Sequence, residues 1–290
     1  MKSLKEAVAE AEEKKVAIGH FNVSDTEAFW AIVNAARSLS VPVIIGVSEG
    51  ERDFIGVRQV EALVKSVRDE FDFPIYLNAD HTYSVERIEE AVHAGFDSVI
   101  FDQTKLPLEE NITVTKEAVE RAKSINPDVL VEGEFGYIGT SSKVLDAIPE
   151  GAEITEEHLS KPEELAQFVS ETGVDMVAPA VGNLHGMLKH GKNPNLSIKR
   201  IAELRTAGGV PMTLHGGSGI SDEDFRKAIE AGMSIVHINT EIRRAYRAGI
   251  ERVLKESPEE VAPYRFLKGG VEDMQRVVEA RLRLFNKINI

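Results

Sequence analysis

The chain has 290 residues, and its 48 acidic and 34 basic side chains give a formal net charge of −14 at pH 7. This acidic balance argues against a general binder of nucleic acid or of anionic membrane surfaces, although an anionic small substrate needs only a local positive site. Apolar residues make up 42% of the chain, which supports a sizeable core and argues against disorder. The absence of cysteine excludes disulfides, thiolate catalysis and thiolate metal ligands.

The N-terminal stretch MKSLKEAVAEAEEKKV has no apolar signal core. No apolar run approaches the roughly 20 residues that a membrane-spanning helix needs. We therefore expect a cytoplasmic protein without membrane partners.

Eight short apolar runs, rich in β-branched residues, are spaced along the chain. Near-continuous apolar runs of this length are typical of parallel strands that are covered on both faces. The predicted strands are VAIGHF (16–21), PVIIGVS (42–48), PIYLNA (74–79), DSVIFD (97–102), DVLVEGE (128–134), DMVAPAV (175–181), VPMTLH (210–215) and SIVHIN (234–239).

Amphipathic stretches with helical periodicity alternate with these runs, and several begin at Ser or Asp and end at Gly. The clearest are residues 25–39, 84–95, 110–125, 161–173, 221–232 and 271–288. Eight alternating units in this length predict a closed (β/α)₈ TIM barrel, an α/β fold, as a single domain over residues 1–290 with an additional C-terminal helix. Residues 136–154 read as a long loop after the fifth strand, which is typical of an active-site lid.

The C-terminal ends of barrel strands are where such folds carry their chemistry. Every predicted strand here delivers a polar residue or a glycine at that end. The candidates are Asn22, Ser48, Asp80 with His81, Asp102, Glu132, Gly182 with His185, His215, and Asn239 with Thr240.

Histidines follow three of the strands. His81, His185 and His215 come after strands three, six and seven, so they converge on one barrel mouth, where three neutral imidazoles can bind a catalytic metal with one position open. The alternative is that each is an ordinary loop histidine. His20 and His237 lie inside strands one and eight, where a buried role in the barrel is expected; for His237 contact with substrate is an equal alternative.

A glycine-rich segment, LHGGSG (214–219), precedes one predicted helix, and INT (238–240) precedes another. Exposed backbone N–H groups at a helix start attract an anion, and the loops after strands seven and eight are the usual phosphate site of such barrels. Arg243 and Arg244, one turn into the last of these helices, either add positive charge or belong to a solvated face.

At these residues the sequence resembles the class II, metal-dependent fructose-bisphosphate and tagatose-bisphosphate aldolases over nearly its whole length. The matching blocks occur in the same order as in that family. They are FN (21–22), VSEG (47–50), ADH (79–81), HAGFDSVIFD (93–102), VEGEFG (131–136), APAVGNLHG (178–186), LHGGSG (214–219) and NTEIR (239–243).

The resemblance implies a role for each matching residue. His81, His185 and His215 match the catalytic metal ligands, usually of Zn²⁺, with another divalent transition metal as the alternative and a monovalent cation as an optional addition. Asp80 matches the acid/base that moves the proton of the C4 hydroxyl, and Asp102 and Glu132 match secondary or alternative ligands. The substrate contacts implied are Gly182, Gly217, Ser218 and Thr240 at the C1 phosphate, Asn22 and Ser48 near that end, and Arg243 at the far phosphate. His237 and Asn239 are also expected to contact the substrate, because they lie at the end of strand eight.

The resemblance also implies a small phosphorylated sugar as partner and a homodimer or homotetramer. The sequence departs from the family in four places. DHT (80–82) replaces DHG, GNLHG (182–186) replaces GTSHG, and His237 replaces an Asn. The fourth is the strand-five loop, where the family carries an acid that protonates the enediolate and this chain has Ser141, Ser142 and Lys143, so that Asp146, Glu150 and Glu153 are the candidate replacements.

These residues predict metal-dependent aldol cleavage, most simply of fructose 1,6-bisphosphate, with tagatose 1,6-bisphosphate as the alternative substrate. A Schiff-base route requires a lysine on a barrel strand, and none of the eight predicted strands contains one. A metal-dependent hydrolase would carry His-x-His after strand one, where this chain reads GHFNV (19–23). The missing loop acid keeps open a barrel that binds a phosphosugar with weak or no turnover.

Overall fold

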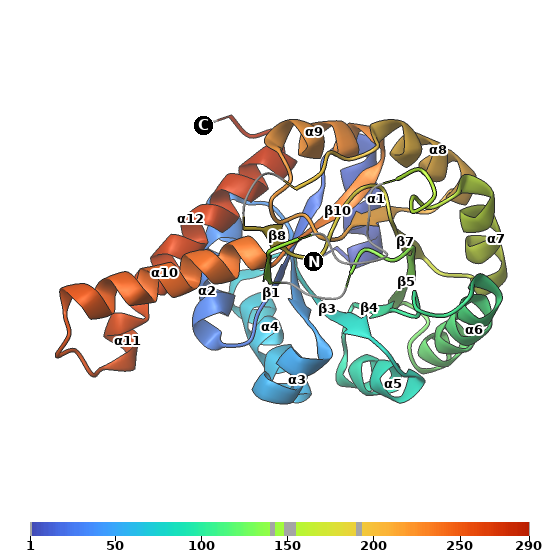
Figure 1. The fold of residues 1–290 in the computed structure, drawn as a ribbon. Helices are drawn as coiled ribbons and strands as arrows, with labels where there is room; N and C mark the ends of the chain where they lie inside the picture. Colours follow the sequence, from blue (N-terminus) through green and yellow to red (C-terminus); the bar gives the residue numbers. More distant parts are fainter. Residues whose placement is uncertain (1, 140–142, 148–154, 190–192, 290) are drawn as a thin grey trace.

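Eight parallel strands close into a barrel surrounded by helices, as the sequence predicts (Figure 1). This computed structural model describes residues 2–139, 143–147, 155–189 and 193–289. The strands are hydrogen-bonded in the order β1-β10-β9-β7-β5-β4-β3-β2. Their bounds are β1 Ile18–Asn22, β2 Val43–Val47, β3 Ile75–Thr82, β4 Ser98–Phe101, β5 Leu130–Phe135, β7 Met176–Pro179, β9 Met212–Leu214 and β10 Met233–Ile238.

The helices form the outer ring, and the six predicted from periodicity occur with ends shifted by three residues at most. Asp25 caps the first of them by accepting a hydrogen bond from the Ala28 N–H at 2.7 Å. The helices are α1 Leu4–Lys14, α2 Thr26–Leu39, α3 Glu49–Ile55, α4 Val57–Phe71, α5 Val85–Ala94, α6 Leu108–Ile125, α7 Pro162–Thr172, α8 Ile198–Gly208, α9 Asp222–Ala231, α10 Thr240–Glu256, α11 Pro263–Phe266 and α12 Lys268–Phe285.

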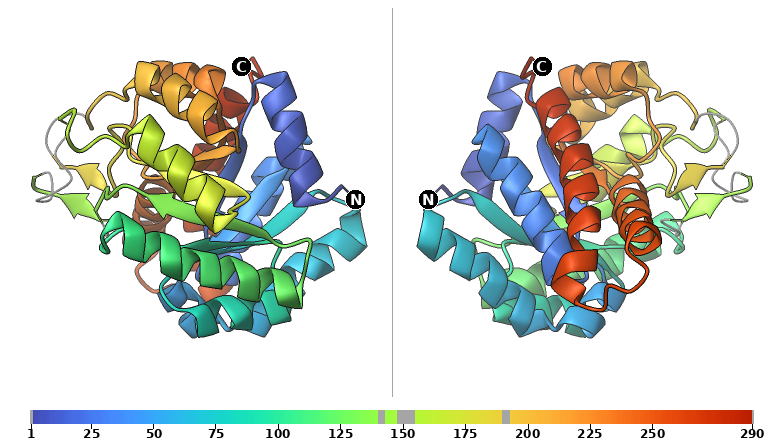
Figure 2. Two further views of the ribbon diagram at one scale, coloured as in Figure 1. Left: turned by 90° about the vertical axis from the view of Figure 1, so that its right-hand side faces the viewer. Right: turned by 90° about the vertical axis from the view of Figure 1, so that its left-hand side faces the viewer.

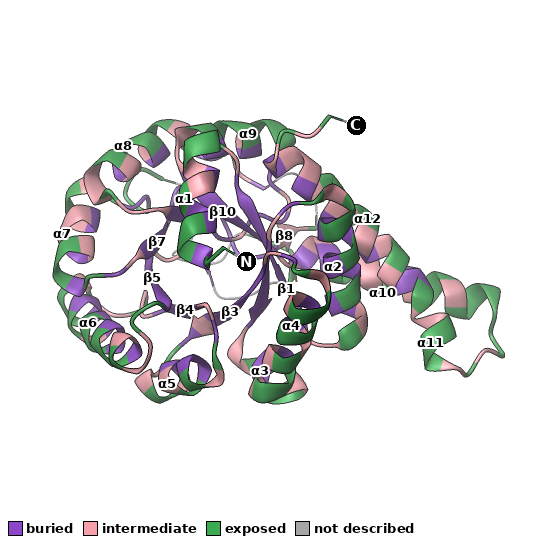
Figure 3. Ribbon diagram, turned by 180° about the vertical axis from the view of Figure 1, so that it is seen from behind, coloured by how far each residue is buried: buried purple, intermediate pink, exposed green. Residues whose placement is uncertain are grey.

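The N-terminal end of the barrel is closed by α1, which lies across the opening (Figure 3). The buried face of α1, including Leu4 and Val8, packs against the first residues of the strands, among them Ile18 and Ile44. The phenol of Tyr76 adds a hydrogen bond to the Lys2 carbonyl at 3.0 Å. Since α1 covers this end, the opposite end, where the strands finish, is the one available to a ligand.

The last helices extend away from the barrel. α10 and α12 pack side by side and project from one flank, with α11 at the tip (Figures 1 and 2). The two helices approach closely at Gly249, where a Cβ atom would lie 2.2 Å from the Gly269 carbonyl oxygen. The inner end of α12 buries Val278, Leu282 and Phe285 in the main core, so the projecting pair is anchored to the barrel.

No helix in the described part of the chain combines the length and the apolar character needed to cross a membrane.

Candidate active site

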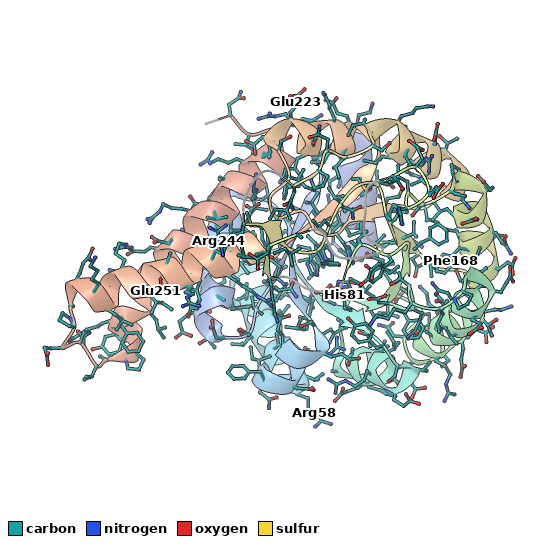
Figure 4. All side chains as sticks on the ribbon, viewed as in Figure 1. Arg58, His81, Phe168, Glu223, Arg244 and Glu251 are labelled. Atoms are coloured by element: carbon teal, nitrogen blue, oxygen red, sulfur yellow. The ribbon has the colours of Figure 1, made fainter. Side chains whose placement is uncertain are left out.

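A small cavity opens at the C-terminal ends of the strands, where the sequence places the candidate residues. Figure 4 shows His81 in the barrel mouth, with Arg244 on α10 to one side. The cavity is lined by Asn22, Asp80, His81, His185, Gly186, Gly216, Gly217, Ser218, His237, Asn239 and Thr240. Gly182, Ser48 and Arg243, also predicted as substrate contacts, are absent from this lining.

Three histidines lie around one carboxylate, Glu134 of β5: His81 near the end of β3, His185 after β7 and His215 after β9. Its oxygens lie 3.1 Å from His81 Nδ1, 3.4 Å from His215 Nδ1 and 3.8 Å from His185 Nε2. Four such groups within 4.8 Å of one another form a donor set that suits a divalent metal ion.

Among the described residues, three of these buried donor atoms form no hydrogen bond of acceptable geometry: Glu134 Oε2, His185 Nε2 and His215 Nδ1. Buried polar atoms are normally paired, because an unpaired one costs about 1–3 kcal/mol. Burial alone would raise the pKa of Glu134, but the neighbouring His81 lowers it well below its ordinary value. An ionised carboxylate beside unpaired imidazole nitrogens is the arrangement that a metal ion would satisfy.

Glu132 lies on the other side of the His215 ring. Its Oε1 is 2.8 Å from His215 Nε2, and its Oε2 accepts a hydrogen bond from the Thr213 hydroxyl at 2.6 Å. Burial would lower the pKa of His215, but the neighbouring carboxylates of Glu132 and Glu134 raise it to about 9. A carboxylate behind a ligating histidine fixes the ring and its tautomer, leaving Nδ1 available.

The carboxylate that lies among all three histidines is Glu134, which the sequence did not indicate; Glu132, the predicted secondary ligand, contacts His215 alone of the three and forms a group with His215 and His237. Side chains two apart on a strand point to the same side, so both glutamates face the barrel interior. Glu134 is two residues nearer the strand end and lies at the mouth. The pattern Glu-x-Glu at the end of the fifth strand was the signal that could have identified it.

Asp102, the other predicted secondary ligand, is a neighbour of His81. Its Oδ2 lies 3.2 Å from His81 Nδ1, and its Oδ1 accepts hydrogen bonds from the N–H and hydroxyl of Thr104. His81 itself has a backbone φ of 34°, a left-handed conformation that is uncommon for residues other than glycine. Glu134 and Asp80 raise the pKa of His81 well above its ordinary value, against the lowering effect of burial.

Asp80 lines the cavity, and one of its two carboxylate oxygens is hydrogen-bonded to Asn22. Its Oδ2 accepts a hydrogen bond from the Asn22 amide at 2.8 Å, while its buried Oδ1 has no hydrogen-bond partner in the parts of the chain that the structure describes and lies 3.7 Å from His237 Nδ1. Burial would raise the pKa of Asp80, but His81 and the other nearby histidines lower it to about 2. This carboxylate is ionised at neutral pH and able to accept a proton.

His20 and His237 stack face to face, with ring centroids 3.5 Å apart and planes 3° apart. His20 is fixed by a 3.0 Å contact between its Nε2 and Asn78 Oδ1, and burial lowers the pKa of both rings. Although these two histidines and Asp80 also lie within 4.8 Å of one another, parallel rings direct their lone pairs along parallel lines, which disfavours a shared metal. His237 thus combines the two alternatives: it is buried in the barrel and lines the cavity.

The glycine-rich segment lies across the cavity near the first turn of α10. A Cβ atom at Gly216, where φ is +63°, would lie 2.4 Å from the Leu184 carbonyl oxygen, and one at Gly217 would lie 2.6 Å from the His237 carbonyl oxygen. Only glycine fits so close an approach. The Ser218 hydroxyl accepts hydrogen bonds from the N–H groups of Asn239 and Glu241, which joins this segment to the helix start.

Arg243 and Ser48 both contact the carboxylate of Glu51, a residue that the sequence did not single out. Arg243 pairs with one oxygen of Glu51, and the other oxygen accepts from Ser48 N at 2.7 Å, Ser48 Oγ at 2.8 Å and the Asn22 amide at 2.7 Å. The structure thus groups Asn22 and Ser48 with Arg243. The sequence Ser-Glu-Gly-Glu (48–51), which forms a capping box at the start of α3, is the pattern that could have identified Glu51. Arg244, the neighbouring cation, is exposed and lies 4.0 Å from Met187 Sδ.

The segment after β5 contains a short strand that the sequence did not predict. β6 Val144–Leu145 pairs in parallel with β8 Met187–Leu188. Asp146, one candidate for the loop acid, is 88% exposed and lies 3.5 Å from Lys189 Nζ, outside the lining of the cavity. Lys143 is exposed, and Ser141, Ser142, Glu150 and Glu153 lie outside the described residues.

The chain is similar to known aldolases over nearly its whole length. The family model described as "Fructose-bisphosphate aldolase class-II" matches residues 2–289. A probable fructose-bisphosphate aldolase of Bacillus subtilis is 35% identical over 290 residues, which cover 99% of this chain and 98% of that protein. A fructose-bisphosphate aldolase of Staphylococcus aureus is 33% identical over 292 residues, with the same coverage of both chains.

Among solved structures, the YdjI aldolase of Escherichia coli K12 is similar to this chain with a TM-score of 0.82 and 28% sequence identity. The match covers 98% of this chain and 96% of that one. The chain therefore belongs to the class II fructose-bisphosphate aldolase family, whose members are lyases that act on a carbon–carbon bond.

Proposed function

We propose that this chain catalyses metal-dependent, reversible aldol cleavage of a ketose that carries a phosphate at C1. Fructose 1,6-bisphosphate, which would give dihydroxyacetone phosphate and glyceraldehyde 3-phosphate, is the first substrate to test because the relatives carry that name. The observation that supports the proposal best is the group of His81, His185, His215 and Glu134, whose unpartnered buried donors lie beside the ionised Asp80.

His81, His185 and His215 would hold the ion, Zn²⁺ or another divalent transition metal, with Glu134 as a further donor. When bound, the ion supplies Lewis-acid stabilisation of the negative charge that develops as the C3–C4 bond breaks. Glu132 would orient His215 through its contact with Nε2, and Asp102 would orient His81 through its contact with Nδ1.

Asp80 is the proposed base. Its free Oδ1 takes the proton of the C4 hydroxyl, the C4–O bond becomes a carbonyl, and the electron pair of the broken C3–C4 bond moves toward C2. Asn22 holds the other Asp80 oxygen, so that the carboxylate keeps one orientation. The N–H groups and glycines at 216–218 would bind the C1 phosphate and fix the three-carbon end in register with Asp80.

Tagatose 1,6-bisphosphate is the alternative substrate. It differs from the fructose compound only in the configuration at C4, the carbon whose hydroxyl faces Asp80. A homodimer or homotetramer is proposed for the assembly, on the resemblance described above.

A second candidate function is phosphosugar binding with weak or no turnover. The observation that favours it is the exposure of Asp146, which leaves the proton donor for the enediolate carbon unassigned among the described residues.

Assaying both ketose bisphosphates, with fructose 1-phosphate beside them, with zinc and with a chelator tests the proposal. We expect zinc-dependent cleavage of at least one of these C1-phosphorylated ketoses, together with exchange of a proton of dihydroxyacetone phosphate with solvent. Binding without cleavage or exchange would favour the second candidate, and activity that survives full chelation would contradict the metal-dependent route.

A further inference from the structure

The carboxylate of Glu51 lies beside the active-site cavity, in a group of hydrogen-bond donors from Arg243, Ser48 and Asn22 that we call the anion receptor. Only 6% of the residue is exposed. One carboxylate oxygen pairs with the Arg243 guanidinium, and the other accepts from the Ser48 N–H, the Ser48 hydroxyl and the Asn22 amide at 2.7–2.8 Å. Four donors from three other residues thus converge on a single carboxylate.

The same four donors suit a phosphate group. Guanidinium, amide, hydroxyl and backbone N–H groups are the usual partners of phosphate oxygens, and arginine binds carboxylate and phosphate alike. In this chain the anion receptor is occupied by a side chain of the protein itself, because Glu51 on α3 reaches Arg243 on α10 across the end of β1.

The receptor lies next to the proposed chemistry. The Asn22 amide that donates to Glu51 also donates to Asp80 Oδ2 at 2.8 Å. If Gly217 and Ser218 hold the C1 phosphate and Asp80 faces the C4 hydroxyl, the carbons beyond C4 continue past Asp80 toward Asn22 and Glu51. The far end of the substrate therefore meets an anion and not a free receptor.

We infer that Glu51 determines substrate specificity by excluding a second phosphate, so that the substrate is a ketose 1-phosphate with an uncharged far end. This inference rests on the proposed function and narrows it: the aldehyde product is an unphosphorylated hydroxyaldehyde. A phosphate at the far end would repel Glu51 and would have to replace all four of its hydrogen-bonded contacts.

Glu51 is also held in place by its own helix. It completes the capping box at the start of α3, in which its side chain accepts from the Ser48 N–H. Moving the Glu51 side chain away to admit a phosphate would uncap α3, remove the partner of Arg243 and remove one of the two acceptors of the Asn22 amide. In the alternative, which we call the latch, the far phosphate of the substrate displaces Glu51 and binds Arg243. The latch requires a preference for bisphosphates over monophosphates.

The test compares fructose 1-phosphate with fructose 1,6-bisphosphate on the zinc-loaded protein. We expect the parent to cleave the monophosphate with a kcat/KM at least equal to that for the bisphosphate. Glu51→Gln keeps the capping-box geometry but removes the charge, and it should raise the bisphosphate-to-monophosphate ratio of kcat/KM at least tenfold. Any disturbance of Asp80 through Asn22 affects both sugars and cancels in the ratio.

Asp53→Asn is the matched control, because Asp53 is an exposed acid on the same helix that pairs with Arg87. It makes the same change in net charge and should leave the ratio unchanged. Arg243→Gln is an independent variant. If Glu51 already occupies the receptor, the bisphosphate-to-monophosphate ratio of kcat/KM should change less than threefold in this variant. The latch instead requires that ratio to fall at least tenfold. Three results would overturn the inference. The parent could have a higher kcat/KM for the bisphosphate than for the monophosphate, Glu51→Gln could raise the bisphosphate-to-monophosphate ratio less than tenfold, or Arg243→Gln could lower that ratio at least tenfold.

Binding calorimetry with the same two sugars separates the inference from the proposed function. If neither sugar is cleaved but Glu51→Gln binds the bisphosphate at least tenfold more tightly relative to the monophosphate, the proposed function fails and the specificity role of Glu51 stands. If the relative affinities do not change, the role of Glu51 is overturned, whether or not cleavage occurs.

Discussion

At the scale of single residues, the two glutamates of β5 have different places around His215. Glu134 lies among the unpartnered ring nitrogens, and Glu132 contacts the opposite ring nitrogen at 2.8 Å. The position of Glu132 behind the ring is that of a residue that orients a ligand.

Changing Glu132 to Gln should therefore weaken zinc binding by about 10–100-fold, the usual effect of removing a partner of a ligating histidine. Competition with a chromophoric chelator measures the dissociation constant. The exposed Glu110, changed to Gln in the same way, should leave it unaltered. An unchanged affinity in Glu132→Gln would show that the contact with His215 has no influence on the metal.

Asp80 offers the second prediction at this scale. Asp80→Asn should lower kcat by about 10²–10⁴-fold, because the amide cannot take the proton of the C4 hydroxyl. The Asn22 contact and the histidines remain, so zinc content and KM should change little. Rapid-quench and steady-state kinetics on the metal-loaded variant measure this, and a kcat within a few-fold of the parent value would remove Asp80 from the mechanism.

At the scale of secondary-structure elements, β1 and β2 fit together only because one of them carries a glycine. A Cβ atom at Gly46 of β2 would lie 2.0 Å from His20 Cε1 of β1. The imidazole of His20 thus uses the space that a side chain on β2 would fill, and it supports the stacked ring of His237.

Gly46→Ala should destabilise the protein by about 1–3 kcal/mol, the usual cost of overpacking a core. Adding His20→Ala removes the clash, so the double variant should be less destabilised than the sum of the single variants by at least about 1 kcal/mol. Urea denaturation measures the three free energies of unfolding. Gly50→Ala, where nothing lies within 4 Å of the added Cβ, is the control and should be neutral or mildly stabilising. Strict additivity would contradict the packing argument.

The strands were predictable because they are short, near-continuous apolar runs covered on both faces, and the helices because their apolar residues recur with helical periodicity on one face. Alternation along a strand gives the face on which a side chain lies but not its depth in the barrel, so the sequence does not show which of Glu132 and Glu134 lies among the three histidines. Glu51 was overlooked because its partner Arg243 is 192 residues away, and nothing local reports such a pairing. β6 and β8, with two residues each, are too short to carry a pattern.

At the scale of the whole molecule, the buried donors of the histidine group link metal binding to folding. Glu134 Oε2, His185 Nε2 and His215 Nδ1 form no hydrogen bond within the described part of the chain, so an ion bound there would satisfy them and stabilise the native state and not the unfolded chain.

Zinc at about 100 times its dissociation constant should add about 2.7 kcal/mol to the free energy of unfolding. For a chain of this size the melting temperature should rise by several degrees, at about 2–4 °C per kcal/mol. Scanning calorimetry with zinc and with a chelator measures the difference. His185→Ala should lose most of the response, whereas the exposed His93, changed to Ala, should keep it. An equal response in both variants would place the stabilising ion elsewhere.

The small β6–β8 sheet joins the segment after β5 to the segment that carries His185. The His185 N–H donates to the Ile138 carbonyl at 2.9 Å, and just beyond it Met187 and Lys189 donate to Lys143 and Leu145 at 3.0 and 2.8 Å. A residue inserted or deleted on one side would shift this pairing by one position and displace the backbone that leads to His185. Over evolutionary time the two segments are therefore not free to drift separately: descendants that gain or lose length in one should carry a compensating change in the other, so that the pair is inherited as a single block.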